Sequence, residues 1–368
     1  MSNLQRTALY EEHVKNGGKI VDFAGWELPI QYEGLVVEHE AVRNDCGMFD
    51  VSHMGEVTVD GKDAEAFVQY LVTNNVKTMK EKQVIYGQMC YENGGIVDDL
   101  LVYKYNTEKY LLVINASNVA KDFAWMQEVV KKFEVKLVNI STETSEVALQ
   151  GPKAEKLLQN LTDKDLSEIG FFFFENPVVI AGVECIVSRT GYTGEDGFEI
   201  YAPNDKITIV WNAIIEKGGD YGLKLCGLGC RDTLRFEVAL PLYGNEMSKD
   251  ISPLEAGLGF FVKLDTDDFI GKSALVKQKE EGLKRKTIGF EIEGRPVARH
   301  EYKVLKNGKE IGFVTTGYNS PSVGKSVGIA IVDAEYAVKG EEIEIQIRKK
   351  TVKAIVTAKR AYKKSYKK

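Results

Sequence analysis

Residues 86–103 read YGQMCYENGGIVDDLLVY, and the rest of the chain is organised around this stretch. Two runs typical of β-strands flank the four residues ENGG at 92–95. The Asn93-Gly94 pair predicts a β-hairpin, because both central residues of a type I′ turn need positive φ. Two adjacent aspartates, Asp98 and Asp99, follow in the second strand among apolar residues. The hairpin therefore carries an unusual pair of acids.

Successive side chains of a strand point to opposite faces, so one of these two aspartates faces inward whichever face is the core. A carboxylate among apolar neighbours needs a hydrogen-bond or charge partner to stay ionised. Two interpretations follow. The aspartate is either structural, capping a loop or pairing with an arginine, or it is held in a pocket to steer or accept a proton. The strand period does not say which aspartate is involved.

The segments around the hairpin alternate between strand and helix patterns. The run YLLVIN at 110–115 predicts a third strand beside the hairpin, and alternation predicts another strand at 56–60. Helix patterns occupy 3–16, 62–72 and 120–132. Residues 171–190 predict a second hairpin, which turns at Ala181-Gly182.

The stretch SRTGYTGEDGFE at 188–199 has three glycines in seven residues, interleaved with Tyr, Thr and acids. Such backbone can approach a ligand closely, although a tight turn without a ligand explains the glycines equally well. The spacing is not that of a nucleotide-binding loop, so phosphate cradling is not supported. Glu199 follows in the strand FEIYA, again as a carboxylate between apolar residues.

A helix is predicted over 227–240, ending before Pro241. Arg231 and Arg235 lie one turn apart on a partly apolar side of it. Arginines in this setting usually extend to solvent or pair with a carboxylate, but one of them could instead meet an anionic ligand.

From about Lys286 the chain changes to short β runs with frequent glycine, including a hairpin signal at Asn307-Gly308. Several short strands at regular spacing predict a small all-β barrel. The charged helical stretch 272–284 leads into it.

The composition is that of an ordinary globular protein, with 368 residues, 44% hydrophobic, 28% charged and a formal charge of −6. This balance argues against a protein that grips a phosphate backbone, although the last ten residues, KRAYKKSYKK, hold six basic side chains. Five scattered cysteines without a CxxC pair, four scattered histidines and no membrane-length apolar run indicate a cytoplasmic protein without a zinc site.

Taken together, the chain closely resembles the glycine cleavage T-protein family of aminomethyltransferases. The resemblance covers nearly the whole chain in the family's order. It is carried by VDFAGWELP (21–29), VRNDCGMFDVSHMGE (42–56), ENGGIVDDLLVY (92–103), SRTGYTGEDGFE (188–199), GCRDTLRFE (229–237) and the hairpin region 307–321.

The resemblance implies a three-domain, cloverleaf-like α+β fold with a C-terminal small β-barrel. Residues 1–275 would form the folate-binding region, two interwoven α+β domains with a hairpin-containing insert at about 55–136, and residues 276–368 the barrel. The implied activity is transfer of the methylene carbon from aminomethyl-dihydrolipoyl H-protein to tetrahydrofolate. This reaction of glycine catabolism releases ammonia and gives methylene-tetrahydrofolate, without pyridoxal phosphate or a metal.

Carried over by motif, Asp99 would be the catalytic carboxylate. The residues expected around the folate are Met54, Tyr86, Asn115, Tyr192, Glu199 and Arg231, with Tyr362 or Tyr366 closing the site from the C-terminal tail. A carboxylate such as Glu199 can accept both donors of the amidine-like pterin edge. The basic tail is a candidate contact for the H-protein, because the partner in this family tends to be acidic.

Three other functions are weaker interpretations. Folate-linked demethylating oxidases carry an extra flavin domain, and this chain has no dinucleotide fingerprint. Helpers of iron–sulfur assembly carry a KGCYxGQ-like stretch, which this sequence lacks. A tRNA-related folate protein would need a basic surface or an attached GTPase, which the acidic net charge and missing P-loop disfavour.

Overall fold

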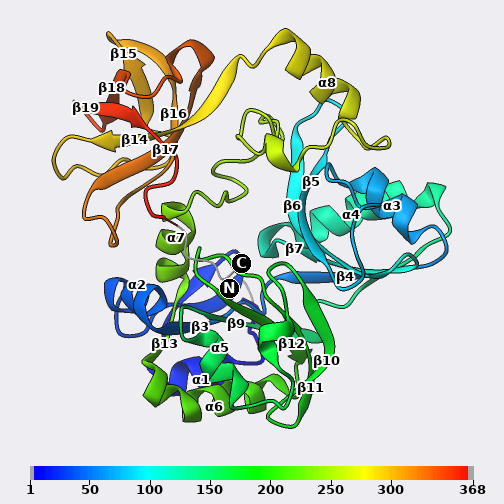
Figure 1. Ribbon diagram of the computed structural model, residues 1–368. Helices are drawn as coiled ribbons and strands as arrows, with labels where there is room; N and C mark the ends of the chain where they lie inside the picture. Colours follow the sequence, from blue (N-terminus) through cyan, green and yellow to red (C-terminus); the bar gives the residue numbers. More distant parts are fainter. Residues whose placement is uncertain (1–3, 364–368) are drawn as a thin grey trace.

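The structure is a computed structural model that describes residues 4–363. Two helix-covered β-sheets and one closed β-barrel meet around helix α7 (Leu228–Glu237). In Figure 1 the barrel lies at the upper left, the five-stranded sheet at the right and the six-stranded sheet below. The predicted three-domain α+β fold with a C-terminal barrel is confirmed.

The six-stranded sheet has the strand order β10-β11-β12-β9-β3-β13, in which only the β13–β3 pair is parallel. Helices α5 (Ala154–Gln159) and α6 (Ile207–Gly218) cover it, and Trp211 of α6 is fully buried in the shared core. Its strands are β3 (Cys46–Asp50), β9 (Thr144–Gln150), β10 (Phe174–Ile180), β11 (Val183–Ser188), β12 (Gly197–Pro203) and β13 (Leu223–Leu225). The predicted turn at Ala181-Gly182 is confirmed, because both residues have positive φ, +49° and +82°.

The five-stranded sheet is antiparallel throughout, with the order β5-β6-β7-β4-β8. Helices α3 (Ala64–Leu71) and α4 (Val119–Val129) pack on one core with it. Its strands are β4 (Gly55–Asp60), β5 (Val84–Cys90), β6 (Ile96–Asn106), β7 (Lys109–Ile114) and β8 (Lys136–Asn139). The prediction that 110–115 forms the third strand beside the hairpin is confirmed.

The turn between β5 and β6 differs from the predicted type I′ turn. Gly94 has positive φ (+83°), whereas Asn93 does not. The Gly94 N–H donates to the Tyr91 carbonyl (2.9 Å), and the pairing register shifts between Met89 and Cys90. A turn followed by a left-handed glycine produces such a bulge. The hairpin was correctly predicted, but its turn type was wrong.

The barrel closes in the order β14-β17-β16-β15-β18-β19. Phe290 is fully buried in its core, and a Cβ on Gly328 would lie 2.2 Å from the Phe290 ring, so the residue facing Phe290 has no room for a side chain. The predicted two-residue turn is present, because Asn307 and Gly308 both have positive φ. The strands are β14 (Arg285–Ile292), β15 (Lys303–Lys306), β16 (Lys309–Asn319), β17 (Ser326–Asp333), β18 (Glu342–Ile347) and β19 (Lys350–Thr357), and α8 (Lys272–Glu281) precedes them.

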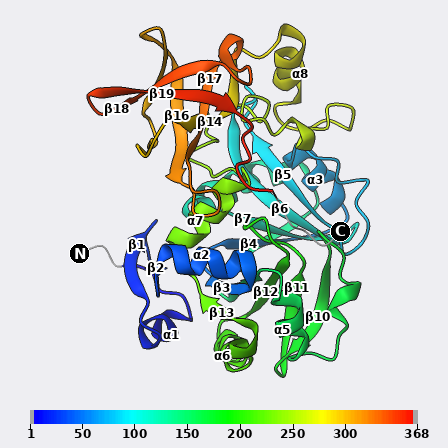
Figure 2. The ribbon, with the colours of Figure 1, turned by 60° about the vertical axis from the view of Figure 1, so that its left-hand side comes forward.

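Helix α7 lies beneath the barrel and beside α2 (Leu35–Asn44), as Figure 2 shows. It ends at Glu237, earlier than the predicted 240. The Glu237 carboxylate of α7 contacts two other parts of the chain. It pairs with both His39 and Arg43 of α2 and accepts from the Ser322 hydroxyl in the loop between β16 and β17. This ion pair and hydrogen-bond cluster fixes the barrel against the helices.

The N-terminal segment contains less helix than the predicted 3–16, because α1 spans only Tyr10–Lys15. Gln5 instead pairs with the strand hairpin β1 (Lys19–Phe23) and β2 (Trp26–Gln31). Its N–H donates to the Gly25 carbonyl and its own carbonyl accepts from the Glu27 N–H, both at 2.8 Å. Residues around Gln5 therefore pair with the edge of this hairpin instead of extending the helix.

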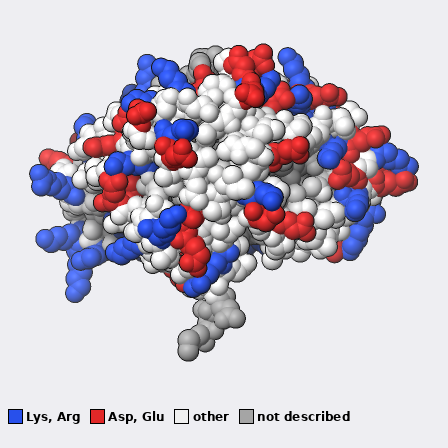
Figure 3. Space-filling view, turned by 90° about the horizontal axis from the view of Figure 1, so that it is seen from below, with Lys and Arg blue, Asp and Glu red and all other residues white. Residues whose placement is uncertain are grey.

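The five cysteines are buried and free. No helix within residues 4–363 has both the length and the apolar character needed to cross a bilayer. On the face seen in Figure 3, acidic and basic side chains are interleaved around the rim and the middle is largely uncharged.

Candidate active site

Asp98 and Asp99 lie on opposite faces of β6, as the strand period requires. Asp98 is fully buried and Asp99 is half-buried. The pairing of Leu100 with Ile114 places Asn115, the residue after β7, opposite Asp99. Its Nδ2 donates to Asp99 Oδ1 (2.7 Å) and to Asp98 Oδ1 (3.0 Å). One amide therefore holds both carboxyl groups.

The environment of Asp99 raises the pKa of its carboxyl to about 7. Burial is the largest cause, the negative charge of an ionised Asp98 would add to it, and hydrogen bonds from Tyr86 and Asn115 act in the opposite direction. Tyr86 reaches Asp99 because Gln88 pairs with Asp99 across the hairpin and Tyr86 shares the face of Gln88. A carboxyl that titrates near neutral pH is a common property of functional sites.

Tyr86 is itself held by the segment that follows α7. Its ring meets Phe261 edge-on, with centroids 4.8 Å apart, and Phe260 packs on Phe261 at 5.2 Å. Its hydroxyl also lies 3.9 Å from the Met247 sulfur. An aromatic series thus runs from exposed Phe260 to the tyrosine beside Asp99.

Glu199 lies on β12 in a nearly closed environment, 6% exposed. Burial raises the pKa of its carboxyl, whereas a hydrogen bond from the Thr190 hydroxyl and the charge of Arg231 lower it. Behind Thr190 a chain of hydroxyls continues through Ser188 (2.6 Å) to Tyr103 (3.0 Å) and Tyr201 (2.9 Å). The chain fixes the Thr190 hydroxyl against one oxygen of Glu199.

Arg231 and Arg235 have different environments, although they lie one turn apart on α7. Arg235 is fully buried and pairs with Asp232 (2.7 Å) and Glu246 (2.8 Å). Arg231 is half-buried, lies over the Tyr192 ring at 4.7 Å, and has no carboxylate within 4 Å among residues 4–363. Of the two predicted alternatives, Arg235 is the paired arginine and Arg231 is available to a ligand.

Tyr192 connects the two ends of the site. Its hydroxyl donates to the Pro241 carbonyl, and its own pKa is raised by burial, with the charges of Asp99 and Arg231 both acting on it. Met54 is half-buried and packs between the Phe49–Leu234 cluster and the Tyr103–Tyr201 cluster. The structure thus brings together seven of the predicted residues: Met54, Tyr86, Asp99, Asn115, Tyr192, Glu199 and Arg231.

The two tyrosines predicted to close the site from the tail, Tyr362 and Tyr366, are not among these seven residues. The Tyr362 ring lies under the Arg43 guanidinium at 4.1 Å, and its N–H donates to the Glu237 carbonyl (2.9 Å). It interacts with Glu195, three residues after Tyr192, rather than with Asp99. Tyr366 lies outside the described residues.

Sequence reasoning missed two further acids in this region, Glu56 and Glu146. Glu56 is fully buried, and neither of its carboxyl oxygens has a hydrogen-bond partner within the described chain. Burial raises the pKa of Glu56 well above its usual range, and the same holds for Glu146, which Glu199 and Glu56 both repel. The strand of Glu56 also carries Thr58 and Asp60, and Glu146 follows Thr144 and Ser145, so neither glutamate stands out in the sequence as Glu199 does between apolar residues.

His53 is nearly fully buried beside Phe23, and burial together with the charge of Arg231 lowers its pKa to about 4. It is therefore neutral at physiological pH. Across residues 4–363, no set of three or more His, Cys, Asp or Glu side chains is placed to hold a metal ion.

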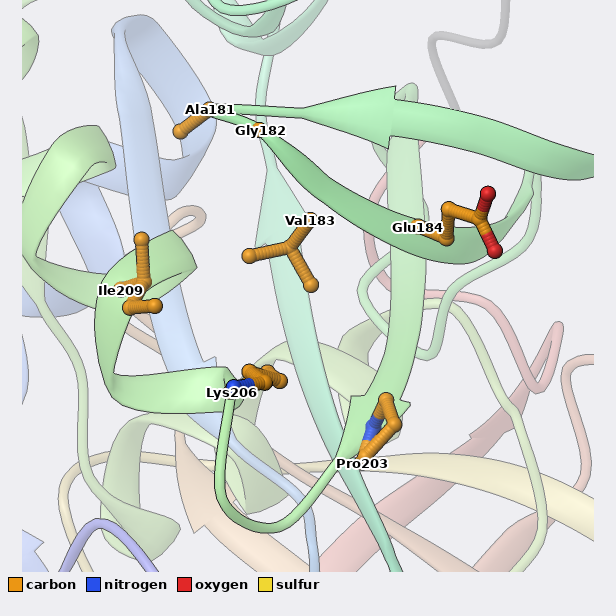
Figure 4. A pocket seen from close by; sticks show the side chains of 7 residues that line it. All are labelled: Ala181, Gly182, Val183, Glu184, Pro203, Lys206 and Ile209. Carbon is orange, nitrogen blue, oxygen red and sulfur yellow. The ribbon is translucent and has the colours of Figure 1, made fainter.

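Two surface pockets lie away from the residues around Asp99. One of about 330 Å³ is lined by the turn Ala181-Gly182, the end of β12 and the start of α6, with Val183 and Ile209 as its apolar walls (Figure 4). Its lysine, Lys206, is paired with Asp205 (3.5 Å). This surface hollow shares no residue with the group around Asp99.

Comparison with known proteins is consistent along the whole chain. Residues 9–266 match the family model of the GCVT N-terminal domain, and residues 285–363 match that of the glycine cleavage T-protein C-terminal barrel domain. The aminomethyltransferase of Alkaliphilus oremlandii is 62% identical over 368 residues, covering 100% of both chains. That of Caldanaerobacter subterraneus subsp. tengcongensis is 57% identical, covering 100% of this chain and 98% of the relative.

A solved structure extends the comparison to the fold. The crystal structure of glycine cleavage system aminomethyltransferase T from Bartonella henselae superposes with a TM-score of 0.92 at 30% identity. The superposition covers 99% of this chain and 100% of that one.

Proposed function

Because this chain belongs to the glycine cleavage T-protein family and is an aminomethyltransferase, we propose that its reaction takes place between Asp99 and Glu199. Members of the family use tetrahydrofolate as the acceptor of the one-carbon unit. The observation that carries the proposal is the group of contacts that links Asp99, Tyr86, Asn115, Tyr192 and Arg231. It combines a carboxyl titrating near pH 7 with an arginine available to an anion.

The residues at the Glu199 end fit a folate. Glu199 is buried and receives one hydroxyl, from Thr190, which leaves acceptor capacity for the donors of a pterin edge. Arg231 is supported on the Tyr192 ring and has no carboxylate within 4 Å among residues 4–363, so its guanidinium can donate to an acceptor oxygen of the same ligand. Met54 offers an apolar wall. Tetrahydrofolate, when bound, supplies the nucleophilic nitrogen.

Asp99 acts at the reacting carbon in this proposal. Positive charge develops there as the amine leaves, and a half-buried carboxylate stabilises it more strongly than one in water. Asn115 and Tyr86 donate to Asp99 and so fix its orientation. The role is mainly electrostatic and positional, although a pKa of about 7 also suits proton exchange.

The remaining assignments extend the same proposal. The donor is the aminomethyl-loaded lipoyl arm of an H-protein, and the enzyme works in the cytoplasm without pyridoxal phosphate or a metal of its own. Tyr362 closes the site from the tail, supported by its contact with Glu195 in the loop that also carries Tyr192. Tyr366 is retained as the alternative closing residue.

The experiment follows ammonia release from aminomethyl-loaded lipoyl H-protein with and without tetrahydrofolate. We expect strong acceleration by folate, reduced about 10²–10³-fold in Asp99→Asn, which keeps the shape and removes the charge. Asp268→Asn is the matched control, because Asp268 is exposed. Near-normal turnover in Asp99→Asn would refute the role of this carboxylate, and tight folate binding without acceleration would refute the reaction at this site.

A further inference from the structure

Behind Asp99, the opposite face of β6 carries a second acid pair that the reaction itself does not use. Asp98 of β6 and Asp122 of α4 are both fully buried. Lys121, also of α4, is the cation beside them, and its ammonium lies 2.7 Å from Asp122 Oδ1. This group is connected to Asp99 through Asn115.

The contacts of the two carboxyl groups are complementary. Asp98 accepts from the amides of Asn115 and Asn118, one to each oxygen and both at 3.0 Å. Asp122 Oδ1 accepts from Lys121, but Asp122 Oδ2 is buried and receives no N–H or O–H from any described residue. Asp98 is the side chain within hydrogen-bonding reach of Asp122. Two carboxyls can satisfy each other in this way only when one carries a proton.

The balance of charges also requires a proton on one of these carboxyl groups. If all three aspartates of the region were ionised, three negative charges would face the single ammonium of Lys121. Lys121 is itself held by the Val97 carbonyl and by the Tyr243 ring at 4.8 Å, so it cannot move toward Asp99 without losing these contacts. Like charges this close in a buried site do not all ionise.

We propose that Asp98 and Asp122 share one proton. The pair positions Asn115 and leaves Asp99 as the negatively charged carboxylate of the site. The inference rests on the proposed role of Asp99. With the proton shared, Lys121 balances the pair, and Asp99 is left as the uncompensated charge at the reacting carbon. Asp98 and Asp122 are positioning residues, because neither contacts the proposed reactants.

The proton resides on Asp98, because Asp122 is ion-paired with Lys121 at Oδ1 and its buried Oδ2 has no other donor among the described residues. Burial and the adjacent Asp122 raise the pKa of Asp98 well above its usual range, whereas the hydrogen bond from Asp98 and the charge of Lys121 limit the rise for Asp122. The other titratable groups around the two aspartates and Asp99 are the phenols of Tyr86, Tyr192 and Tyr243. Burial raises the pKa of all three, so they stay neutral near pH 7.

The first test measures the proton directly by infrared spectroscopy of the whole protein at pH 7 to 8. The wild-type minus Asp98→Asn difference spectrum is expected to contain the carbonyl band of one protonated, buried carboxylic acid. A difference that contains only carboxylate bands would show that Asp98 is ionised and would overturn the proposal. Glu56→Gln, which removes a separate buried acid, provides a reference band. This readout does not depend on turnover.

The second test uses the acid limb of the pH profile of kcat/KM. Asp98→Asn removes no charge under the proposal, so the acid limb should stay at the same pH. Asp122→Asn transfers the negative charge to Asp98 and should shift the acid limb to a pH about one unit higher. A downward shift of that size in Asp98→Asn would contradict the shared proton. If Asp99→Asn retained normal turnover, the role of Asp99 would fail while the infrared result on Asp98 would still stand.

Discussion

The guanidinium of Arg231 lies 4.7 Å from the centre of the Tyr192 ring, on the side of α7 that faces Glu199 and Asp99. Arg235, four residues later, is enclosed by Asp232 and Glu246. The same side chain therefore occurs twice on one helix, once supported on a ring with no carboxylate partner within residues 4–363, and once in a complete ion-pair cluster. This difference predicts that Arg231 serves ligand binding and that Arg235 serves the stability of the fold.

Replacing each arginine should give opposite results. In Arg231→Gln we expect tetrahydrofolate binding to weaken about 10- to 100-fold, the value of a charge-assisted hydrogen bond, with little change in the thermal midpoint. In Arg235→Gln the buried carboxylate of Glu246 and the half-buried carboxylate of Asp232 lose their ion-pair partner, which should lower the free energy of unfolding by about 3–5 kcal/mol. Calorimetric titration and thermal denaturation measure the two effects. Equal destabilisation by both changes would contradict the assignment of Arg231.

The pH dependence of turnover should report the ionisation of Asp99. Its pKa is raised to about 7, so the carboxyl is protonated and neutral below that pH and ionised above it. If the ionised form is active, kcat/KM falls about tenfold per pH unit below 7 and levels off above it. The measurement is the rate of ammonia release across this range. A limb that persisted unchanged in Asp99→Asn would belong to another group.

Glu56→Gln should make the protein more stable at high pH. Because burial raises the pKa of Glu56 in the folded state, this carboxyl contributes most to stability below its unfolded pKa and loses that contribution as the pH rises. Glutamine carries no such proton cost, so we expect a gain of about 1–3 kcal/mol at pH 8 and almost none at pH 4. Denaturant titrations at the two pH values test this. Glu280→Gln, at an exposed position of α8, is the control. An equal gain in stability at pH 8 in Glu280→Gln would show that burial of Glu56 is not the cause.

Shortening the tail should affect the partner more than the folate. Truncation after Tyr362 keeps the backbone bond to Glu237 and the contact with Arg43, but removes the four lysines of 363–368. We expect a higher KM for H-protein, with a smaller salt dependence, and unchanged affinity for free tetrahydrofolate. Steady-state kinetics at two salt concentrations measure the effect. Equal loss of both affinities would instead indicate that the tail, including Tyr366, lies in the folate site.

The sequence predicted turns best where no other part of the chain interferes. A Cβ at Gly182 or Gly308 would meet no atom within 4 Å, and both turns have the predicted positive φ values. Asn93-Gly94 has the same signature, but Gly94 lies against Leu275 of α8 and Gly95 against the Lys249 carbonyl. Contacts with residues far away in the sequence selected a different turn there, and no local pattern contains that information.

The sequence proposes site residues where a motif or an out-of-place charge marks them. Asp99, Glu199 and Arg231 were proposed in this way, but the strand period left Asp98 and Asp99 equivalent. Their distinction depends on α4, which brings Asp122 and Lys121 against one face only. Glu56 and Glu146 lie in strands with other polar residues and carried no such signal, and their closeness to one another depends on how two different sheets pack.

The hairpin tip also determines where foreign sequence can be inserted. Loop tips are usually the most permissive sites for a fluorescent label or an affinity tag. At Gly95 even one methyl group would lie 1.9 Å from the Lys249 carbonyl, so an insertion there would displace the strand that carries Asp99. The barrel turn at Asn307-Gly308 has open space around it. A probe placed in that turn would report on the enzyme while leaving the strand of Asp99 in position.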